Sequence, residues 1–261
     1  MKFAKKSLGQ NYLIDKNIIR KIINLVKIKD RNIIEIGPGT GALTDEILKR
    51  KPRSLSIIEK DKNLFKNLKI KYINNDHVNV YNADILKFNI ENIVKDDTSV
   101  FGNLPYNISS QILVNMIKFK KWPPKYKDLI FMFQKELGEK IIGRFNTSNY
   151  GRLSIIANLK LNIIKKFHVS ANCFFPKPKI TSLILHAQPK KNNLFKIKNL
   201  DNLEKVTNIL FSNKRKMINK NITKLLNKNM INSINGINLK FRPSEIKPEI
   251  FYRITELFEA K

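Results

Sequence analysis

One short segment, 101–107, carries the residue types best suited to chemistry. An apolar stretch runs there into a glycine, an asparagine, a leucine, a proline and a tyrosine. A strand ending in this turn presents the Asn103 amide, the Leu104 backbone carbonyl and the Tyr106 ring at the carboxyl edge of a sheet, where open α/β sheets bind ligands. Such a set suits a flat heterocycle with an amino group, because the ring stacks on its face and the oxygens accept its N–H groups. An ordinary turn at the end of a strand has a similar composition, so other segments of the chain must distinguish a ligand-binding segment from such a turn.

A glycine-rich turn over 37–41 is the second segment with ligand-binding character. It follows an apolar strand pattern at 32–36 and precedes a helical pattern, as in nucleotide-binding α/β units. Its Glu-x-Gly-x-Gly-x-Gly spacing differs from the dinucleotide fingerprint, and Glu35 suits a cationic cofactor better than a pyrophosphate. S-adenosylmethionine therefore fits, and NAD fits poorly. Glu59 follows the next strand about 20 residues later, where a carboxylate can accept from both ribose hydroxyls. The alternative is that Glu35 and Glu59 are solvent-exposed acids at strand ends with no role in ligand binding.

The next strand pattern, 78–81, also ends at a carboxylate, Asp84, followed by the apolar Ile85. This pair can hold an adenine ring, with Asp84 accepting from the exocyclic amine. A further aromatic candidate is Phe174, in the proline-containing segment 173–179, which we expect to be a rigid loop because proline cannot continue a helix or a central strand. The alternative is that the phenylalanines of this loop belong to the core.

Strands and helices alternate along the first part of the chain, which predicts an α/β fold with a doubly wound, Rossmann-like sheet. We expect seven strands, mostly parallel, and an irregular arm over 1–14. After a linker at about 190–193, helical spacing predicts a small all-α C-terminal domain. The expected domains are therefore 1–188, which binds the cofactor, and 189–261. The strand patterns lie at 32–36, 54–58, 78–81, 99–103, 129–133, 162–169 and 181–186.

Charge is the dominant compositional feature: 50 lysines and arginines against 21 acids give a formal net charge of +29. This excess favours a polyanionic partner, although biased base composition of the coding DNA would also enrich lysine. No apolar run approaches the roughly 18 residues of a membrane span. Cys173 is the only cysteine, which indicates a reducing compartment such as the cytoplasm. The three histidines are too scattered to predict a metal site.

These motifs together resemble one family. Segments 8–13, 35–41, 103–107 and 174–179 occur in the order seen in ribosomal RNA adenine dimethyltransferases of the KsgA type, and the helical tail with 211–216 also matches. One departure is Tyr12, where the family usually has phenylalanine. The resemblance implies transfer of two methyl groups from S-adenosylmethionine to N6 of each of two adjacent adenosines. These lie in a hairpin loop near the 3′ end of small-subunit rRNA, within the immature 30S subunit.

The resemblance also assigns residues, each carried over from a matching motif position. The expected catalytic residues are Asn103, Leu104, Tyr106 and Phe174. The expected cofactor-binding residues are Asn11, Leu13, Gly37, Gly39, Glu59, Asp84, Ile85 and Asn103. Candidate phosphate contacts are Lys177, Lys179, Lys214, Arg215 and Lys216, and the 189–261 domain is expected to contact rRNA. We expect a monomer that binds neither membrane nor DNA.

Three other functions share parts of this pattern. A resistance-type methyltransferase of large-subunit rRNA shares the fold and the aromatic motifs, although the arm at 9–11 and the tail favour the small-subunit enzyme. A DNA adenine methyltransferase usually carries a target-recognition insert, which is not apparent here. An RNA-binding assembly factor without chemistry is disfavoured by the presence of Glu59, Asp84 and Asn103.

Overall fold

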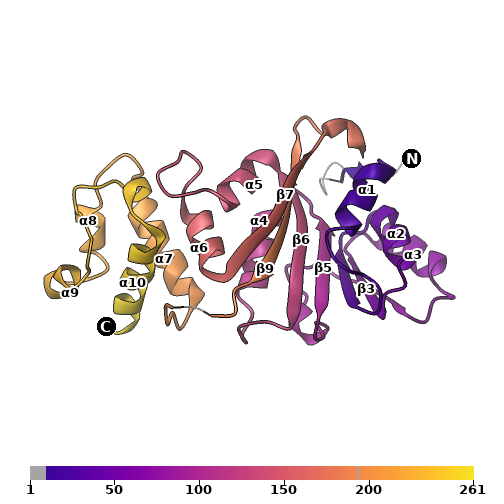
Figure 1. The fold of residues 1–261 in the computed structure, drawn as a ribbon, viewed down its shortest axis with the longest axis horizontal. Coiled ribbons are helices and arrows are strands. Elements are labelled where there is room, and N and C mark those ends of the chain that lie inside the picture. The colour runs from indigo at the N-terminus through magenta and orange to yellow at the C-terminus, as the bar shows by residue number, and fades with distance from the viewer. Residues whose placement is uncertain (1–9, 193) are drawn as a thin grey trace. The chain divides into compact units, whose positions relative to one another are not determined.

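The computed structural model describes residues 10–192 and 194–261 (Figure 1). The chain forms two compact units, Met1–Gly138 with Asn162–Pro189 and Glu139–Leu161 with Lys190–Lys261. The division into units differs from the expected 188/189 boundary at segment 139–161, which belongs to the second unit, and at Pro189, which belongs to the first. This segment joins the C-terminal unit because the Tyr150 hydroxyl donates to the Ile246 carbonyl at 2.9 Å and the Tyr252 hydroxyl donates to the Ile155 carbonyl at 2.8 Å. Predictions for 1–9 and 193 lie outside the described residues.

The first unit is built on a seven-stranded sheet, which confirms the expected α/β, mostly parallel architecture. The strand order is β4-β3-β2-β5-β6-β9-β7. The pairs from β4 to β6 are parallel, whereas β6 and β9 are antiparallel. Because β2 pairs with β3 on one side and with β5 on the other, the strand order reverses at β2, the usual ligand-binding position in such sheets. The strands are β2 (Asn32–Ile36), β3 (Ser54–Glu59), β4 (Val78–Asn82), β5 (Thr98–Asn103), β6 (Tyr126–Gln134), β7 (Leu161–Val169) and β9 (Ser182–Pro189).

Side-chain caps fix where two of the surrounding helices begin. Asp15 accepts from the backbone N–H groups of Asn17 at 2.8 Å and Ile18 at 3.0 Å, as its position before the apolar spacing predicts. Asp61 caps another helix in the same way. The helices of this unit are α1 (Lys16–Ile23), α2 (Ala42–Leu48), α3 (Lys62–Lys71) and α4 (Ser109–Ile117), with single 3₁₀ turns at Ile90–Asn92 and Ala171–Cys173. The boundary between the two units falls within α5 (Lys135–Ile141).

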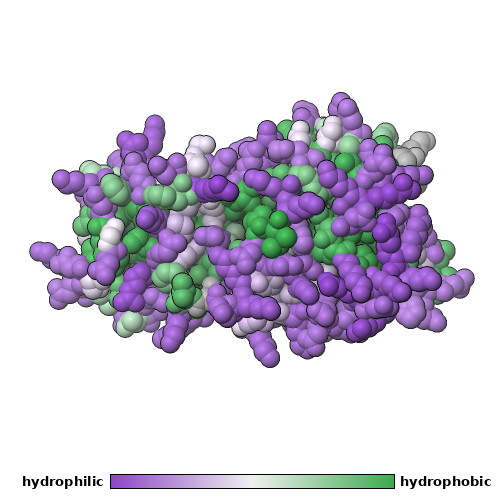
Figure 2. Space-filling view, in the orientation of Figure 1, coloured by the Kyte–Doolittle hydropathy of each residue, from purple (hydrophilic) through white to green (hydrophobic). Residues whose placement is uncertain are grey.

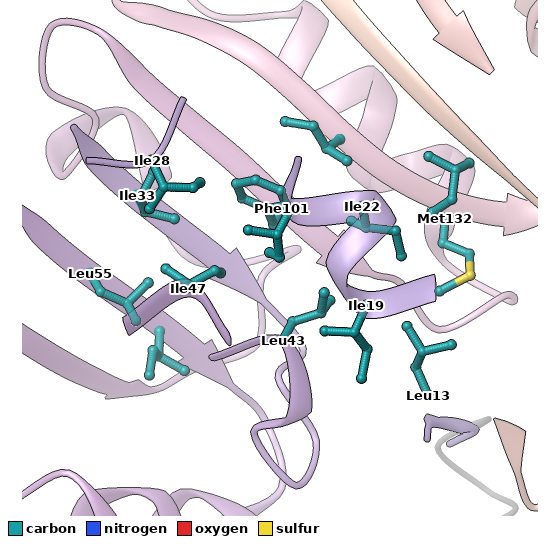
Figure 3. Close-up of a cluster of buried hydrophobic side chains, with 14 of the residues drawn as sticks. Leu13, Ile19, Ile22, Ile28, Ile33, Leu43, Ile47, Leu55, Phe101 and Met132 are labelled. Atoms are coloured by element: carbon teal, nitrogen blue, oxygen red, sulfur yellow. The ribbon is translucent and has the colours of Figure 1, made fainter. Parts of the chain in front are cut away.

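Apolar side chains of α1 and α2 form one continuous core with the sheet. Figure 3 shows Ile19 and Ile22 of α1 beside Leu43 of α2, with Phe101 and Met132 from the strands nearby. All of these side chains are buried. Fully burying a residue of this kind stabilises the fold by about 1.5–3 kcal/mol, so this core holds the carboxyl ends of the strands in place.

The sequence did not predict a small second sheet, formed by β1 (Tyr12–Leu13) and β8 (Phe174–Phe175). The two strands are antiparallel, with Leu13 opposite Phe174 and Tyr12 opposite Phe175. The backbone N–H of Ile14 also donates to the Cys173 carbonyl at 2.8 Å. The expected irregular arm and the expected proline-rich loop are therefore joined to each other.

The second unit contains helices and no strand over its described part from 194 to 261. Its core includes Leu203, Val206 and Leu210, and the rings of Phe211 and Phe251 stack with centroids 5.5 Å apart. The helices are α6 (Arg152–Lys160), α7 (Leu200–Phe211), α8 (Asn219–Ile222), α9 (Lys228–Asn232) and α10 (Pro248–Glu259), with a 3₁₀ turn at Pro243–Glu245.

None of the helices described, over 10–192 and 194–261, has the length and apolar character needed to cross a bilayer.

Candidate active site

A cavity opens at the carboxyl edge of the sheet, between the ends of β2, β3, β4 and β5 and the segment that contains β1. The structure brings together at its wall the residues that were predicted from separate motifs. Among the predicted cofactor-binding residues, the wall includes Asn11, Leu13, Gly37, Gly39, Glu59, Asp84, Ile85 and Asn103. Among the predicted catalytic residues it includes Asn103, Leu104 and Tyr106.

Asn103, the last residue of β5, has a defined amide orientation. Its Nδ2 donates to the backbone carbonyl of Asn11 at 2.9 Å. The side-chain oxygen has no donor among the described residues, so it can accept from a ligand. The arm thus fixes the amide of Asn103 with its acceptor unused, which sequence spacing alone cannot reveal because the two residues are 92 positions apart.

The Tyr106 ring is held in place by hydrogen bonds to β9 and α4. Its hydroxyl forms a 2.7 Å hydrogen bond with Ser182 Oγ, at the start of β9. Ser109, the first residue of α4, donates its hydroxyl to the Tyr106 carbonyl at 3.1 Å. Burial raises the pKa of the Tyr106 hydroxyl, so this group stays protonated at neutral pH. Tyr106 is therefore a rigid, neutral aromatic ring at the cavity wall.

The structure places Phe174 differently from the other predicted catalytic residues. Its side chain is 3% exposed and belongs to the core cluster that contains Leu13, its partner across the β1–β8 pair. Phe174 is not among the described residues that line the cavity. Its neighbour Phe175 is 43% exposed. The loop therefore supports the cavity wall through the core, which is the alternative that the sequence left open.

The glycine turn approaches the ring of Tyr12 closely. Gly37, Gly39 and Gly41 all have positive φ, which L side chains rarely adopt. A Cβ atom on Gly39 would lie 2.7 Å and 2.9 Å from two ring carbons of Tyr12. The Tyr12 hydroxyl donates to Gln10 Oε1 at 2.8 Å. The aromatic ring at position 12 thus closes over the turn, with little change expected from tyrosine in place of phenylalanine.

Glu35 lies fully buried in β2, two positions before Gly37 of this turn. Its Oε2 accepts from the Thr44 hydroxyl at 2.6 Å, whereas its Oε1 is buried with no partner among the described residues. Burial raises the pKa of Glu35 to about 7, against the lowering effect of the Thr44 hydrogen bond. A buried carboxylate oxygen without a donor is costly, so a site beside Glu35 favours a cationic ligand.

Replacing this carboxyl should change the pH dependence of folding. Because the folded pKa is above the ordinary 4.5, the proton on Glu35 stabilises the fold fully below pH 4.5, and this contribution is lost as the pH rises to about 7. At about 1.4 kcal/mol per pH unit this amounts to about 3 kcal/mol at most. We expect Glu35→Gln, measured by urea unfolding without ligand, to lose less stability than the wild type between pH 5 and pH 8. An exposed control, Glu136→Gln, should follow the wild type. Parallel curves for Glu35→Gln and the wild type would contradict the assignment.

Two carboxylates belong to the cavity wall, whereas Glu35 is not among the described residues that line it. Glu59 ends β3, and its Oε1 accepts the backbone N–H of Asp61 at 2.7 Å, while burial raises the pKa of its carboxyl. Asp84 is paired with Lys60, whose Nζ lies 2.8 Å from Oδ2, and this ammonium holds the pKa of Asp84 below its ordinary value. Lys60 also lines the cavity. Ionised Asp84 therefore keeps acceptor capacity beside Ile85.

The predicted phosphate contacts lie outside the cavity wall. Lys177 and Lys179 are exposed on the loop after β8, in the first unit. Lys214, Arg215 and Lys216 are exposed between α7 and α8, in the second unit. Within the described ranges, no group of three or more His, Cys, Asp or Glu side chains is arranged to hold a metal ion.

The family model described as "Ribosomal RNA adenine dimethylase" matches residues 1–260. "Ribosomal RNA small subunit methyltransferase A" of Pelagibacter ubique is 43% identical over 257 residues, covering 98% of this chain and 97% of the relative. The protein of that name from Malacoplasma penetrans is 35% identical, with 97% and 91% covered.

Solved structures agree. A dimethyladenosine transferase from Plasmodium falciparum superposes with a TM-score of 0.78 at 27% identity, covering 93% of this chain and 95% of that chain. The 23S rRNA methyltransferase ErmE shares the fold, with a TM-score of 0.67 at 22% identity, covering 95% and 99%.

Proposed function

Since the chain belongs to the ribosomal RNA adenine dimethylase family, we propose that it methylates N6 of two adjacent adenosines, twice each, in the 3′-terminal hairpin loop of small-subunit rRNA. The methyl donor is S-adenosylmethionine, and the substrate is the immature 30S subunit in the cytoplasm, bound by a monomer. The observation that carries this proposal is the fixed Asn103 amide, whose unused oxygen lies at the wall of the cavity beside the Tyr106 ring.

The residues of the cavity fit S-adenosylmethionine. Gly37 and Gly39 allow close backbone approach, and the buried Glu35 carboxyl, which does not itself line the cavity, places an acidic group behind the glycine turn. Glu59 would hold the ribose hydroxyls, and Asp84 with Ile85 would hold the adenine. Asn11 and Leu13 would close over the cofactor from the arm. When bound, S-adenosylmethionine supplies an electrophilic methyl group on a sulfonium.

The contribution of the protein to the reaction is to orient a weak nucleophile. The adenine amino nitrogen delocalises its lone pair into the ring. Acceptance of its protons by Asn103 Oδ1 and the Leu104 carbonyl would favour a more pyramidal nitrogen, with the lone pair available for attack. Positioning and aimed dipoles then supply most of the acceleration. The methylated ammonium is acidic enough to lose its proton readily, so a strong base is not required.

The target base must leave its stack to enter the cavity, which costs a few kcal/mol and less in a loop. Tyr106 would offset this cost by stacking. Phe174, the second predicted ring, stays a prediction, because its buried position requires the β8 segment to rearrange before it can touch a base. The exposed cations at 177, 179 and 214–216 are our candidates for phosphate contacts, with the second unit contacting rRNA.

Truncating the Tyr106 ring should impair turnover on RNA and leave cofactor affinity nearly unchanged. Loss of stacking of about 1–3 kcal/mol predicts a decrease in kcat/KM of roughly 5- to 150-fold for Tyr106→Ala. Tyr106→Phe keeps the ring and loses only the Ser182 hydrogen bond, so it should retain most activity. The measurement is steady-state methyl transfer combined with calorimetric titration of S-adenosylmethionine. An equal loss of cofactor affinity and turnover would contradict the stacking role.

The positions of the modified bases test the proposed substrate directly. Undermethylated small subunits would be incubated with the protein and S-adenosylmethionine, and nuclease fragments of their rRNA analysed by mass spectrometry. We expect four added methyl groups on one fragment from the 3′-terminal hairpin, as two adjacent dimethyladenosines. Methylation confined to another fragment, or to a base other than adenine, would overturn the proposal.

A further inference from the structure

A groove on the first unit lies between α1 and β7, outside the cavity described above. Three polar residues of α1 and the polar residue at its C-cap line it on one side, and Lys165 and Phe167 of β7 line the other, with Leu25 at its end. The α1 residues are spaced so that they lie on one face of the helix, opposite the buried isoleucines. They are Asn17, Arg20, Lys21 and Asn24.

The lining has a uniform electrostatic character. It contains three cations and two amides, and none of its lining residues is a carboxylate. Within the described chain, Arg20 and Lys165 take part in no ion pair, whereas Lys49, Lys60 and Lys71 are each paired with an acid. Unpaired cations side by side repel each other, so this groove favours an anionic occupant.

The positions of these cations are partly fixed. Lys21 Nζ lies 4.3 Å from the ring centroid of Phe167, a cation–π contact that joins α1 to β7. At one rim, Arg50 NH1 donates to Asn24 Oδ1 at 3.0 Å, although Arg50 also contacts Glu46 at 3.4 Å. Alternation along β7 puts Lys165 and Phe167 on the same face of the strand. The groove thus presents one cation held over an aromatic ring, together with the exposed cations Arg20 and Lys165.

Both walls of the groove lead directly to the candidate active site. α1 begins three residues after Leu13, which lines the cavity, and β7 continues through a single 3₁₀ turn into β8, which pairs with β1. Figure 1 shows α1 and β7 on the part of the molecule that carries the sheet. Figure 2 shows that hydrophilic residues dominate the face in view, so hydrophilic character alone does not distinguish this groove. Its distinguishing features are its hollow shape, the cation–π contact in its wall and the short chain connections from α1 and β7 to the β1–β8 pair.

We propose that the groove between α1 and β7 binds the sugar–phosphate backbone of the rRNA strand that flanks the target adenosines. This inference rests on the proposed function and extends it to a second contact surface. Arg20, Lys21 and Lys165 contact phosphates, and the amides of Asn17 and Asn24 contact phosphate or ribose oxygens. Lysines on an edge strand also protect it against pairing with other strands, a role that would give them no effect on RNA affinity.

The test compares two triple variants that remove the same charge. The groove variant is Arg20→Gln/Lys21→Gln/Lys165→Gln, and the control is Lys62→Gln/Lys66→Gln/Lys69→Gln on exposed positions of α3. Affinity for undermethylated small subunits is measured at several salt concentrations. Each lost phosphate contact lowers the slope of log Kd against log salt by about 0.7–0.9, so the groove variant should lose about two to three from the slope and bind about tenfold more weakly. The control should change affinity less than about threefold.

Further measurements distinguish a loss of RNA contacts in the groove from a loss of folding and from a failure of the proposed function. Thermal unfolding and S-adenosylmethionine affinity should match the wild type, and if the triple variant does not fold, Arg20→Gln/Lys165→Gln replaces it because both side chains are exposed. Equal affinity and equal slope for the groove and control variants would overturn the groove assignment while the proposed function stands. A wild type that neither binds nor methylates small subunits would overturn the proposed function, and the groove assignment with it.

Discussion

Asn103→Ala is expected to reduce methyl transfer by about 10²- to 10³-fold, the loss typical when one aimed polar group of an active site is removed. The physical reason is the arrangement of its amide, which donates to the Asn11 carbonyl at 2.9 Å and keeps its oxygen as an acceptor. Without this oxygen, the adenine amino group would lose one of its two acceptors and its orientation. The measurement is single-turnover methyl transfer to small subunits, which separates chemistry from product release.

Two companion variants sharpen the interpretation of Asn103. Asn103→Asp keeps acceptor oxygens but loses the donor to Asn11, so we expect activity between that of the wild type and that of Asn103→Ala. Asn67→Ala, on the exposed face of α3, should match the wild type. Full activity of Asn103→Ala would show that the amide is not part of the reaction, and full activity of Asn103→Asp would show that its orientation by the arm is unimportant.

Gly39→Ala is expected to weaken S-adenosylmethionine binding by about 100-fold and to destabilise the protein. The added Cβ faces two separate costs: the φ of +60° is unfavourable for alanine by about 1–2 kcal/mol, and the buried Tyr12 ring lies 2.7 Å away. Relief of the clash requires movement of Tyr12 or of the turn, and both line the cavity. A 100-fold loss of affinity corresponds to about 2.8 kcal/mol of binding free energy. Calorimetric titration gives the affinity, and thermal unfolding gives the stability.

Alanine substitutions at two other glycines separate the cost of the positive φ from the cost of the clash with Tyr12. Gly236 has φ of +76° with nothing within 4 Å of its Cβ position, so Gly236→Ala should show the backbone cost alone and leave cofactor binding unchanged. Gly151 has extended φ and equally open space, so Gly151→Ala should be nearly neutral. If Gly39→Ala binds S-adenosylmethionine as tightly as Gly236→Ala does, the close approach of Tyr12 to the turn does not contribute to cofactor binding.

Local patterns predicted much of this fold and most of the cavity wall. Two such features are the strand–glycine turn–helix pattern around Gly37 and Gly39 and the helix cap at Asp15. Each is formed by residues that are close together in the sequence, so a short segment contains all the information needed to predict it. Glu59, Asp84 and Asn103 each follow a strand, and parallel strands bring their carboxyl ends to one edge. Simple periodicity and turn chemistry are sufficient for such features.

Long-range contacts could not be predicted in this way. The β1–β8 pair joins two-residue strands that are about 160 positions apart, too short for any alternation to be detected, and it places Phe174 in the core. The same reason applies to the Asn11 carbonyl that orients Asn103 and to Ser182, which holds Tyr106. Segment 139–161 contains the end of α5, a turn and α6, and only its contacts with the C-terminal helices assign it to the second unit.

The most direct test of the central claim uses S-adenosylmethionine with a labelled methyl group and three substrates: immature small subunits, large-subunit rRNA and duplex DNA, each with the wild type and with Asn103→Ala. We predict label as dimethyladenosine in the small subunits alone, and its loss in the variant. Label in large-subunit rRNA or DNA would contradict the proposed substrate, and tight small-subunit binding without any transfer would contradict the proposed catalysis.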